Sequence, residues 1–214
     1  GADPYPQKVK RTHTIGEVEE NFEELSKAGE EVFVCGRVMA VREHGSIIFC
    51  DVRDKGGEMQ ILVKEDGLKE AAFSEIENNL DIGDFMEVGG KLTITKTEEK
   101  SIEAKQARII TKSVRPLPDK WYGLEDKEKR FRKRYLDLLF NDEVKERFDK
   151  RIKILEAVRE FFLNNNFKEV ETPVLQTEYG GAEASPFMTK LNALDLGLYL
   201  RIAPELFLKR LLCD

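Results

Sequence analysis

Histidine and cysteine are scarce in this chain, which limits the catalytic and metal sites that it can build. Its 214 residues include two histidines, His13 and His44, and three cysteines, Cys35, Cys50 and Cys213. The cysteines do not form the closely spaced pairs of zinc sites, and two histidines make a histidine metal site or a serine–histidine–aspartate triad an unpromising reading. Their odd number and apolar neighbours favour free thiols in a core, in a reducing compartment.

Long apolar runs are also missing. No stretch approaches the roughly 18 apolar residues of a transmembrane helix, and the first residues lack the basic-then-apolar pattern of a signal peptide. We therefore expect a cytoplasmic protein with no membrane partner. Hydrophobic residues make up 41% of the chain and charged residues 36%. A chain of this length and composition can bury a sizeable core and suggests one or two globular domains.

Charge of one sign does not dominate. The net charge of −6 argues against nonspecific coating of nucleic acid. Lysine and arginine are nevertheless concentrated in two segments, Lys91–Arg115 and Lys127–Arg134. Local basic surface on an acidic protein favours a specific polyanionic partner, although a solvated charged face is the alternative for either segment alone.

The first half of the chain has the pattern of a small β domain. Five runs have the alternation and residue types of strands: 32–41, 46–52, 58–63, 84–95 and 101–111. Apolar residues at helical spacing precede the first run, over 16–28, and separate the third run from the fourth, over 67–80. This is the order of elements in a five-stranded OB barrel, a fold that often binds oligonucleotides on the face of its strands 2 and 3.

Alternation also predicts which strand residues face solvent. In the second strand the charged residues mark the solvent face, and Phe49 shares that face as an exposed aromatic. The same reasoning points Gln60 outward, and also Arg37, although a bulge at Gly36 would break the count. An outward arginine, phenylalanine and glutamine on adjacent strands supply a charge, a stacking plane and a hydrogen-bonding group for a base. On these residues alone, RNA binding and an ordinary strand surface both remain open.

The second half of the chain is mainly helical. Prolines in 114–123 indicate a stiff joint between two domains. One apolar stripe runs along 144–162, and the asparagines at 164–166 can end that helix. A short strand is predicted over 168–171, closed by Thr172-Pro173.

Two short segments near the end have the features of a ligand site. The closing segment predicts a strand, a tight turn at Ala203-Pro204 and a helix with Glu205 in its first turn. A carboxylate there either binds a cationic ligand or only compensates the helix dipole. The pair Gly180-Gly181 is typical of a turn, and it also lets backbone approach a small ligand closely. We expect Arg201 to make a structural ion pair.

Taken together, these segments resemble the class II lysyl-tRNA synthetases over nearly the whole chain. The resemblance is carried by the barrel, the joint, the segments after the long helix and the closing strand and helix: 13–114, 115–139, 167–176, 180–187 and 200–206. The segment 42–54 also resembles the aspartyl- and asparaginyl-tRNA synthetases of the same subclass. Gly180-Gly181-Ala182 and Ala203-Pro204-Glu205 favour lysine.

The resemblance implies a domain division. It places an OB-fold anticodon-binding domain over 1–114, with its N-terminal helix, and a linker over 115–124. An incomplete α+β class II synthetase catalytic domain, with its first motif and the beginning of its second, is expected over 125–214.

The resemblance also assigns roles to residues. It gives anticodon binding to Arg37, Phe49 and Gln60. Lysine binding falls to a second group: Gly180, Gly181, Ala182 and Glu205, the last as partner of the α-ammonium. The long helix with Pro173 corresponds to the first motif, which implies a symmetric homodimer for the full-length enzyme.

The family joins lysine to ATP, giving lysyl-adenylate and pyrophosphate, and then transfers lysine to tRNA(Lys). It needs no protein nucleophile, because positioning and charge neutralisation by arginines and Mg²⁺ carry the reaction. The ATP and Mg²⁺ sites are expected beyond residue 214, so we expect no catalytic residue or metal ligand within the chain. The sequence is therefore expected to be a truncated, inactive part of a lysine–tRNA ligase. The alternatives are a non-catalytic tRNA-anticodon-binding protein and an aspartyl- or asparaginyl-type synthetase.

Overall fold

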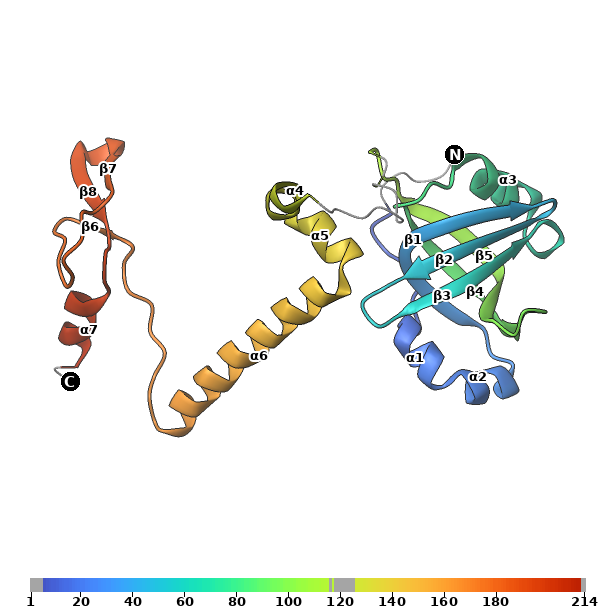
Figure 1. Cartoon of the computed structure of the whole chain (residues 1–214), viewed down its shortest axis with the longest axis horizontal. Helices are drawn as coiled ribbons and strands as arrows, with labels where there is room; N and C mark the ends of the chain where they lie inside the picture. Colours follow the sequence, from blue (N-terminus) through green and yellow to red (C-terminus); the bar gives the residue numbers. More distant parts are fainter. Residues whose placement is uncertain (1–5, 116, 118–125, 213–214) are drawn as a thin grey trace. The chain divides into compact units, whose positions relative to one another are not determined.

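The computed structural model describes residues 6–115, 117 and 126–212. Its contacts divide the chain into a first unit, Gly1–Glu125, and a second unit, Asp126–Asp214, which we describe separately (Figure 1). Most of the predicted joint, and Cys213, lie outside the described residues.

The helix predicted over 16–28 is broken into α1, Ile15–Glu20, and α2, Phe22–Ala28. A capping box starts α1: the Glu17 N–H donates to Thr14 Oγ1 over 3.2 Å, and the Thr14 N–H donates to the Glu17 carboxylate over 2.7 Å. Asn21 interrupts the helix, since its side-chain amide donates to the Glu17 carbonyl over 2.9 Å. The predicted apolar side of these helices is correct: Val18 and Phe22 are buried and Leu25 packs against the core.

Five strands of the first unit form a closed barrel in the order β1-β2-β3-β5-β4. They span Val32–His44, Ile47–Arg53, Glu58–Lys64, Phe85–Ile94 and Lys100–Thr111, numbered in chain order. Strands β3 and β5 run parallel, and the other neighbouring strands of the barrel run antiparallel. A short 3₁₀ turn, η1 at Glu65–Gly67, and the helix α3, Glu70–Asn79, lie between β3 and β4. The predicted OB fold is confirmed.

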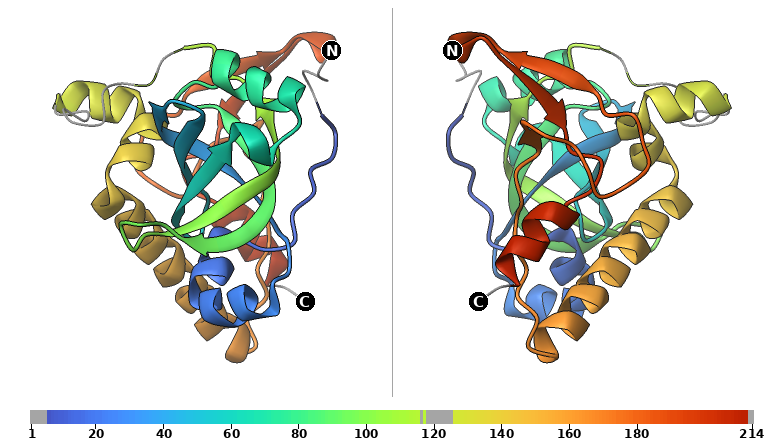
Figure 2. Two further views of the ribbon diagram at one scale, coloured as in Figure 1. Left: turned by 90° about the vertical axis from the view of Figure 1, so that its right-hand side faces the viewer. Right: turned by 90° about the vertical axis from the view of Figure 1, so that its left-hand side faces the viewer.

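The barrel core follows from strand alternation. In β2, Ile48, Cys50 and Val52 are at most 2% exposed, whereas the residues between them are half-buried. Phe73 and Ile76 of α3 complete the core from one end, and α1 and α2 lie at the other end (Figure 2). Each such side chain contributes roughly 1.5–3 kcal/mol by burial. Cys50 is fully buried in this core, as predicted, and its burial raises the pKa of the thiol to about 12.

The second unit begins with three helices, α4 at Lys127–Arg132, α5 at Arg134–Phe140 and α6 at Asp142–Asn164. Asp137, which is fully buried, ties them together. Its carboxylate accepts hydrogen bonds of 2.7 Å from both Arg130 and Asn141, and it pairs with Arg134. Burial alone would raise the pKa of Asp137, but these donors outweigh it and hold the pKa below its usual value.

The asparagines end α6 as predicted: the helix stops at Asn164, and Asn166 adopts a left-handed conformation with φ of 65°. The segment that follows departs from the prediction. The strand predicted over 168–171 is not a strand: these residues have no strand partner among the described residues. The Glu169 carboxylate instead accepts two hydrogen bonds from Arg159 of α6, of 2.7 and 2.9 Å. Alternation without a neighbouring strand does not form a ladder.

A small antiparallel sheet follows, in the order β6-β8-β7. Its strands are β6 at Leu175–Gln176, β7 at Met188–Leu191 and β8 at Leu196–Leu200, with a 3₁₀ turn, η2 at Asn192–Leu194, between the last two. The helix α7, Glu205–Leu211, closes the described chain. The predicted strand, turn and helix of the closing segment are therefore present.

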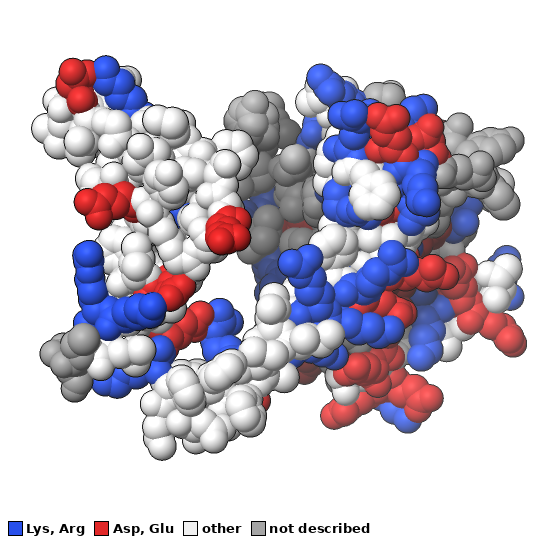
Figure 3. All heavy atoms as spheres, turned by 60° about the vertical axis from the view of Figure 1, so that its left-hand side comes forward, with Lys and Arg blue, Asp and Glu red and all other residues white. Residues whose placement is uncertain are grey.

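Apolar side chains of the second unit are mostly exposed. Val144 is buried, but the rest of the predicted stripe on α6 is between 39% and 55% exposed: Phe148, Ile152, Leu155, Val158 and Phe162. In Figure 3 an uncharged surface covers the C-terminal end of α6, at the lowest part of the view. Across the described residues, no helix is both long enough and apolar enough to cross a membrane.

Candidate nucleic-acid interface and amino-acid site

The outer face of β1, β2 and β3 carries the three residues predicted to bind RNA. Phe49, Asp51 and Arg53 occupy every second position of β2 and therefore lie on this face. Arg53 pairs with Arg37 of β1, and Asp51 pairs with Gln60 of β3. Because cross-strand partners point to the same side of a sheet, Arg37, Phe49 and Gln60 share one face, as alternation predicts.

Arg37 is held in a defined position on this face. One terminal nitrogen, Nη1, donates to the Gly83 carbonyl over 2.9 Å, and the guanidinium carbon lies 4.3 Å from the centre of the Phe85 ring. Partial burial lowers the pKa of Arg37, but an arginine remains charged at neutral pH. The register shift of β1 lies between Val38 and Ala40 rather than at Gly36, so the predicted phase of Arg37 is correct.

Phe49 is half-buried, so the expectation of an exposed aromatic was wrong. Its cross-strand neighbours are Arg42 on β1 and Leu62 on β3. The His44 ring also lies edge-on to it, with ring centres 6.4 Å apart. Alternation predicts which side of a strand a residue faces, but it does not predict how far long side chains on neighbouring strands cover that residue.

Gln60 lies on the outer side of its strand but is only 7% exposed, which corrects the expectation of a free outward amide. Its amide nitrogen donates to the Glu99 carboxylate over 2.7 Å, and Ser101 Oγ donates to its amide oxygen over 3.0 Å. A primary amide has two N–H donors and two lone pairs, so one of each remains for a ligand.

Glu99 is a candidate functional residue that the sequence did not single out. It precedes β5 and reaches Gln60 because β3 and β5 pair in parallel, with Gln60 opposite Ser101. The two residues are 39 positions apart, so no local spacing could have revealed the contact.

Charges on this face are largely paired. Arg42 pairs with Asp51 at 2.9 Å, Arg53 with Glu58 at 2.6 Å and Lys64 with Glu103 at 2.9 Å. Such a face attracts RNA less than a uniformly basic one and favours recognition by shape and hydrogen bonds. A hollow of about 490 Å³ extends the face beyond Phe49, and it is lined by Ser46, Ile47, Lys64, Glu65 and Asp66.

The second unit brings the predicted lysine-binding segments together. Gly181 has φ of +90°, and a Cβ there would lie 3.1 Å from Glu205 Cβ and 3.2 Å from Glu205 Oε2. A Cβ on Gly180 would lie 3.1 Å from Leu206 Cδ1. The glycine turn, which continues into Ala182, therefore packs against the start of α7 in a way that side chains would obstruct.

Glu205 is the first residue of α7 and follows Pro204 at the N-cap. Its carboxylate lies 2.5 Å from Lys209 Nζ, and its side chain is 43% exposed. The acid therefore pairs with an ammonium group while remaining open to solvent. Compensation of the helix dipole is compatible with the same geometry.

Arg201 does not show the predicted ion pair among its described contacts. Its Nη1 donates to the Thr172 carbonyl over 2.6 Å and to the Thr172 hydroxyl over 2.7 Å. The Arg201 backbone N–H donates to Val174 over 2.8 Å. These bonds fasten the exposed Pro173 beside the end of β8.

Gln176 is a second residue that the sequence did not single out. It pairs with Tyr199 of β8 and is 5% exposed, and its amide nitrogen has no hydrogen-bond partner among the residues that the structure describes. Its burial depends on strands far apart in sequence. Across the described residues, no three histidine, cysteine, aspartate or glutamate side chains gather into a metal-binding cluster.

Comparison with known proteins matches both units. Residues 126–213 match the model for class II tRNA synthetases of the D, K and N type, and residues 32–110 match that for OB-fold nucleic acid binding domains. A lysine–tRNA ligase of Clostridium novyi (strain NT) is 46% identical over 213 residues, which cover 99% of this chain and 41% of that protein.

Two further lysine–tRNA ligases have the same identity. They come from Clostridium botulinum (strain Langeland / NCTC 10281 / Type F) and Enterobacter sp. (strain 638), and the matches cover 99% and 97% of this chain. Each match covers 42% of the relative. The chain thus spans about two fifths of the length of the curated relatives it matches.

Proposed function

We propose that this chain, which belongs to the lysine–tRNA ligase family of class II tRNA synthetases, is part of a protein that activates L-lysine with ATP. That protein then transfers the lysine to tRNA(Lys) in the cytoplasm. The first unit reads the anticodon, and the second unit contributes part of the lysine site. The outer face of the barrel, on which Arg37, Phe49 and Gln60 meet, is the observation that carries this proposal.

Arg37, Phe49 and Gln60 divide the recognition of the anticodon between them. Arg37 offers charged N–H donors in a fixed orientation, because the Gly83 carbonyl and the Phe85 ring restrain it. Phe49 offers a stacking surface for a base, and Gln60 offers its remaining N–H and lone pair to a base edge. The Glu99 carboxylate orients the Gln60 amide.

Glu205 and the Gly180-Gly181 turn form the α-amino end of the lysine site. The carboxylate already accepts an ammonium, that of Lys209, so a substrate α-ammonium can take the same position. The backbone at Gly181 lies close enough to Glu205 that a ligand held by the carboxylate also meets the turn. Ala182 keeps the turn small.

ATP is the co-substrate and Mg²⁺ the metal ion of the proposed reaction, as is general in this family. Their ligands are expected in the part of the ligase that the matched two fifths do not cover. Within the present sequence, Glu205 and the glycine turn act by orienting lysine, so that its carboxylate meets the α-phosphate.

The exposed stripe of α6 is the proposed homodimer surface. A groove of about 390 Å³ lies along its C-terminal half, and five of its lining residues are apolar: Leu155, Val158, Phe162, Leu163 and Phe167. Exposed apolar surface of this kind marks an interaction site. A second copy related by a twofold axis would cover it, and Pro173 would lie at that interface.

A titration of the chain with a synthetic RNA stem-loop carrying the lysine anticodon UUU tests the anticodon assignment. We expect Phe49→Ala to weaken binding by about 1–3 kcal/mol, the usual contribution of stacking on an aromatic side chain. Phe49→Tyr keeps the ring and serves as the matched control with near-normal affinity. A variant that binds as tightly as the original chain, or equal affinity for a stem-loop with another anticodon, would contradict the assignment.

ATP–pyrophosphate exchange by the full-length protein tests the substrate. Lysine should support exchange, whereas aspartate and asparagine should not. Exchange with aspartate or asparagine would instead identify the protein as one of the related enzymes of the subclass. Absence of exchange with all three would favour a non-catalytic anticodon-binding protein.

A further inference from the structure

Arg37 rests on a seat formed by three consecutive residues, Gly83, Asp84 and Phe85. The Gly83 carbonyl accepts a hydrogen bond of 2.9 Å from Arg37 Nη1, and the Phe85 ring lies beneath the guanidinium at 4.3 Å. The hydrogen bond restrains the direction of the N–H groups, and the ring restrains the guanidinium position.

This Arg37 seat is joined to β1 directly beyond the arginine. The Val38 N–H donates to the Asp84 carbonyl over 2.8 Å, and the Gly83 N–H donates to the Val38 carbonyl over 2.8 Å. Gly83 has φ of +103°, and a Cβ there would lie 2.9 Å from Ser113 Oγ. The turn therefore depends on glycine and on what packs behind it.

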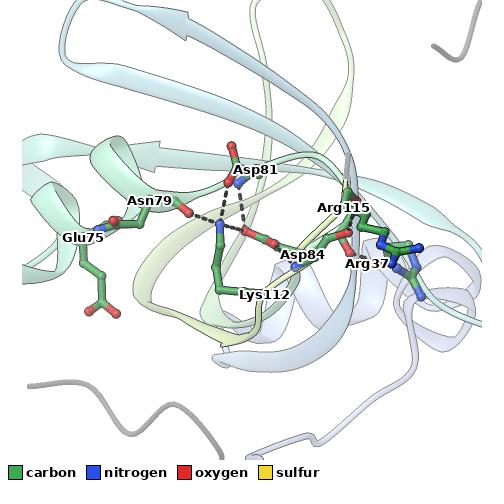
Figure 4. Close-up of polar contacts among 9 residues, drawn as sticks. Arg37, Glu75, Asn79, Asp81, Asp84, Lys112 and Arg115 are labelled. Carbon is green, nitrogen blue, oxygen red and sulfur yellow. Dashed lines mark hydrogen bonds and ion pairs between the residues drawn. The ribbon is translucent and has the colours of Figure 1, made fainter. Parts of the chain in front are cut away.

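The Asp84 carboxylate, which is fully buried, anchors the seat from behind. It accepts hydrogen bonds from the Asp81 N–H over 2.8 Å, from the Ser113 N–H over 2.6 Å and from Lys112 Nζ over 2.6 Å (Figure 4). These donors come from the loop before β4 and from the chain directly after β5. A buried carboxylate is stable only while such partners remain.

Lys112 supplies the only side-chain cation seen on Asp84 among the described residues. Its ammonium group also pairs with Asp81 at 2.7 Å and donates to the Asn79 carbonyl. Burial acts to lower the pKa of Lys112, but the hydrogen bonds to Asp81 and Asp84 outweigh it and leave the pKa raised. The lysine therefore stays charged at neutral pH.

We propose that Lys112 and Asp84 are positioning residues for RNA recognition, which act by holding the seat and thereby the guanidinium of Arg37. This inference rests on the proposed anticodon-reading function. Arginine has many rotamers, and holding one of them before RNA arrives reduces the entropy lost on binding. Removing the Lys112 ammonium leaves Asp84 buried without a cation, so the seat rearranges and Arg37 is released.

A double-mutant cycle tests this proposal, with the whole chain titrated with the UUU stem-loop. We expect Arg37→Ala to weaken binding about tenfold, as for a well-placed arginine contact. Lys112→Met should weaken binding several-fold, and the double variant should bind no more weakly than Arg37→Ala. Lys112→Arg, which keeps the cation, should restore most of the affinity.

Lys105→Met is the matched control. Lys105 lies on β5, its side chain is 41% exposed against 43% for Lys112, and it pairs with Glu103 at 2.9 Å. Its loss removes the same charge without touching the seat. We expect its effect to be small and to add to that of Arg37→Ala, as for independent sites.

Circular dichroism and thermal unfolding show whether each variant keeps the barrel. Should Lys112→Met not fold, Asp84→Asn takes its place in the cycle, since the amide keeps the shape of the carboxylate but removes the charge that Lys112 pairs with. Wild-type affinity in the folded variant, or an effect that adds in full to that of Arg37→Ala, would overturn the proposal. Failure of the unaltered chain to distinguish UUU from another anticodon would overturn the proposed function itself, and this inference with it.

Discussion

Isoleucines in the middle of a barrel strand and on α6 occupy opposite environments. In the first unit Ile61 is fully buried, because the barrel closes and each strand faces apolar side chains from the others. In the second unit Ile152 and Ile154 of α6 are 52% and 63% exposed. A closed barrel supplies every side of its own core, whereas a single long helix supplies one side only.

The polar groups differ in the same way. The Asp84 carboxylate of the first unit is fully buried and satisfied by donors from the barrel. Glu205 of the second unit is open to solvent, and the buried amide nitrogen of Gln176 has no hydrogen-bond partner within the described part of the chain. Outside the buried and paired Asp137, the second unit thus keeps its polar groups less enclosed than the first unit does.

Hydrogen exchange of the whole chain should show the largest difference between the units. Barrel amides exchange by global unfolding, for which a domain requires about 5–15 kcal/mol, so they should be at least about 10³-fold slower than those of 168–172. Measurement of both regions in one sample provides the internal control. Equal protection of the two regions would contradict the difference in burial between the units. It would indicate that another copy covers the second unit, which sedimentation would then reveal.

A matched pair of isoleucine substitutions should give the next largest effect. We expect Ile61→Ala to lower the free energy of unfolding by about 2–5 kcal/mol, because it leaves a cavity in the barrel core. Ile154→Ala, at an exposed position of α6, should change it by about 0.5 kcal/mol or less. Urea denaturation followed by circular dichroism measures both. A large loss in Ile154→Ala would mean that α6 is buried in solution.

Two glycines with positive φ should give the smallest effect and separate stability from function. Gly29 ends α2 with φ of 67° and open space around it, so Gly29→Ala should cost the barrel about 1–2 kcal/mol through backbone strain. Gly181→Ala should leave the unfolding of the barrel unchanged while it displaces Glu205. NMR-resolved urea titration follows the two units separately. A barrel destabilised by Gly181→Ala would show that the units are coupled.

Short-range patterns were sufficient for most of the elements. The five barrel strands and α3 occur where alternation and helical spacing predict them, because the spacing of apolar residues reports the period of each element. The prediction of a strand over 168–171 was wrong because a strand also needs a neighbouring strand, which no local pattern provides. The prediction of one continuous helix over 16–28 was wrong for a similar reason. The apolar spacing continues through Asn21, but the Asn21 side chain caps α1.

The sequence by itself determined the order of elements in the barrel, the inward face of its strands and the family that the chain resembles. Only the tertiary structure decided how accessible the predicted site residues are and what holds them. Gln60 is covered by Glu99, and Arg37 is held by a turn that Lys112 anchors. These contacts join residues 28 to 46 positions apart, so they depend on barrel closure rather than on local spacing. Side-chain direction follows from the period of a strand, but burial and hydrogen bonding follow from which strands become neighbours.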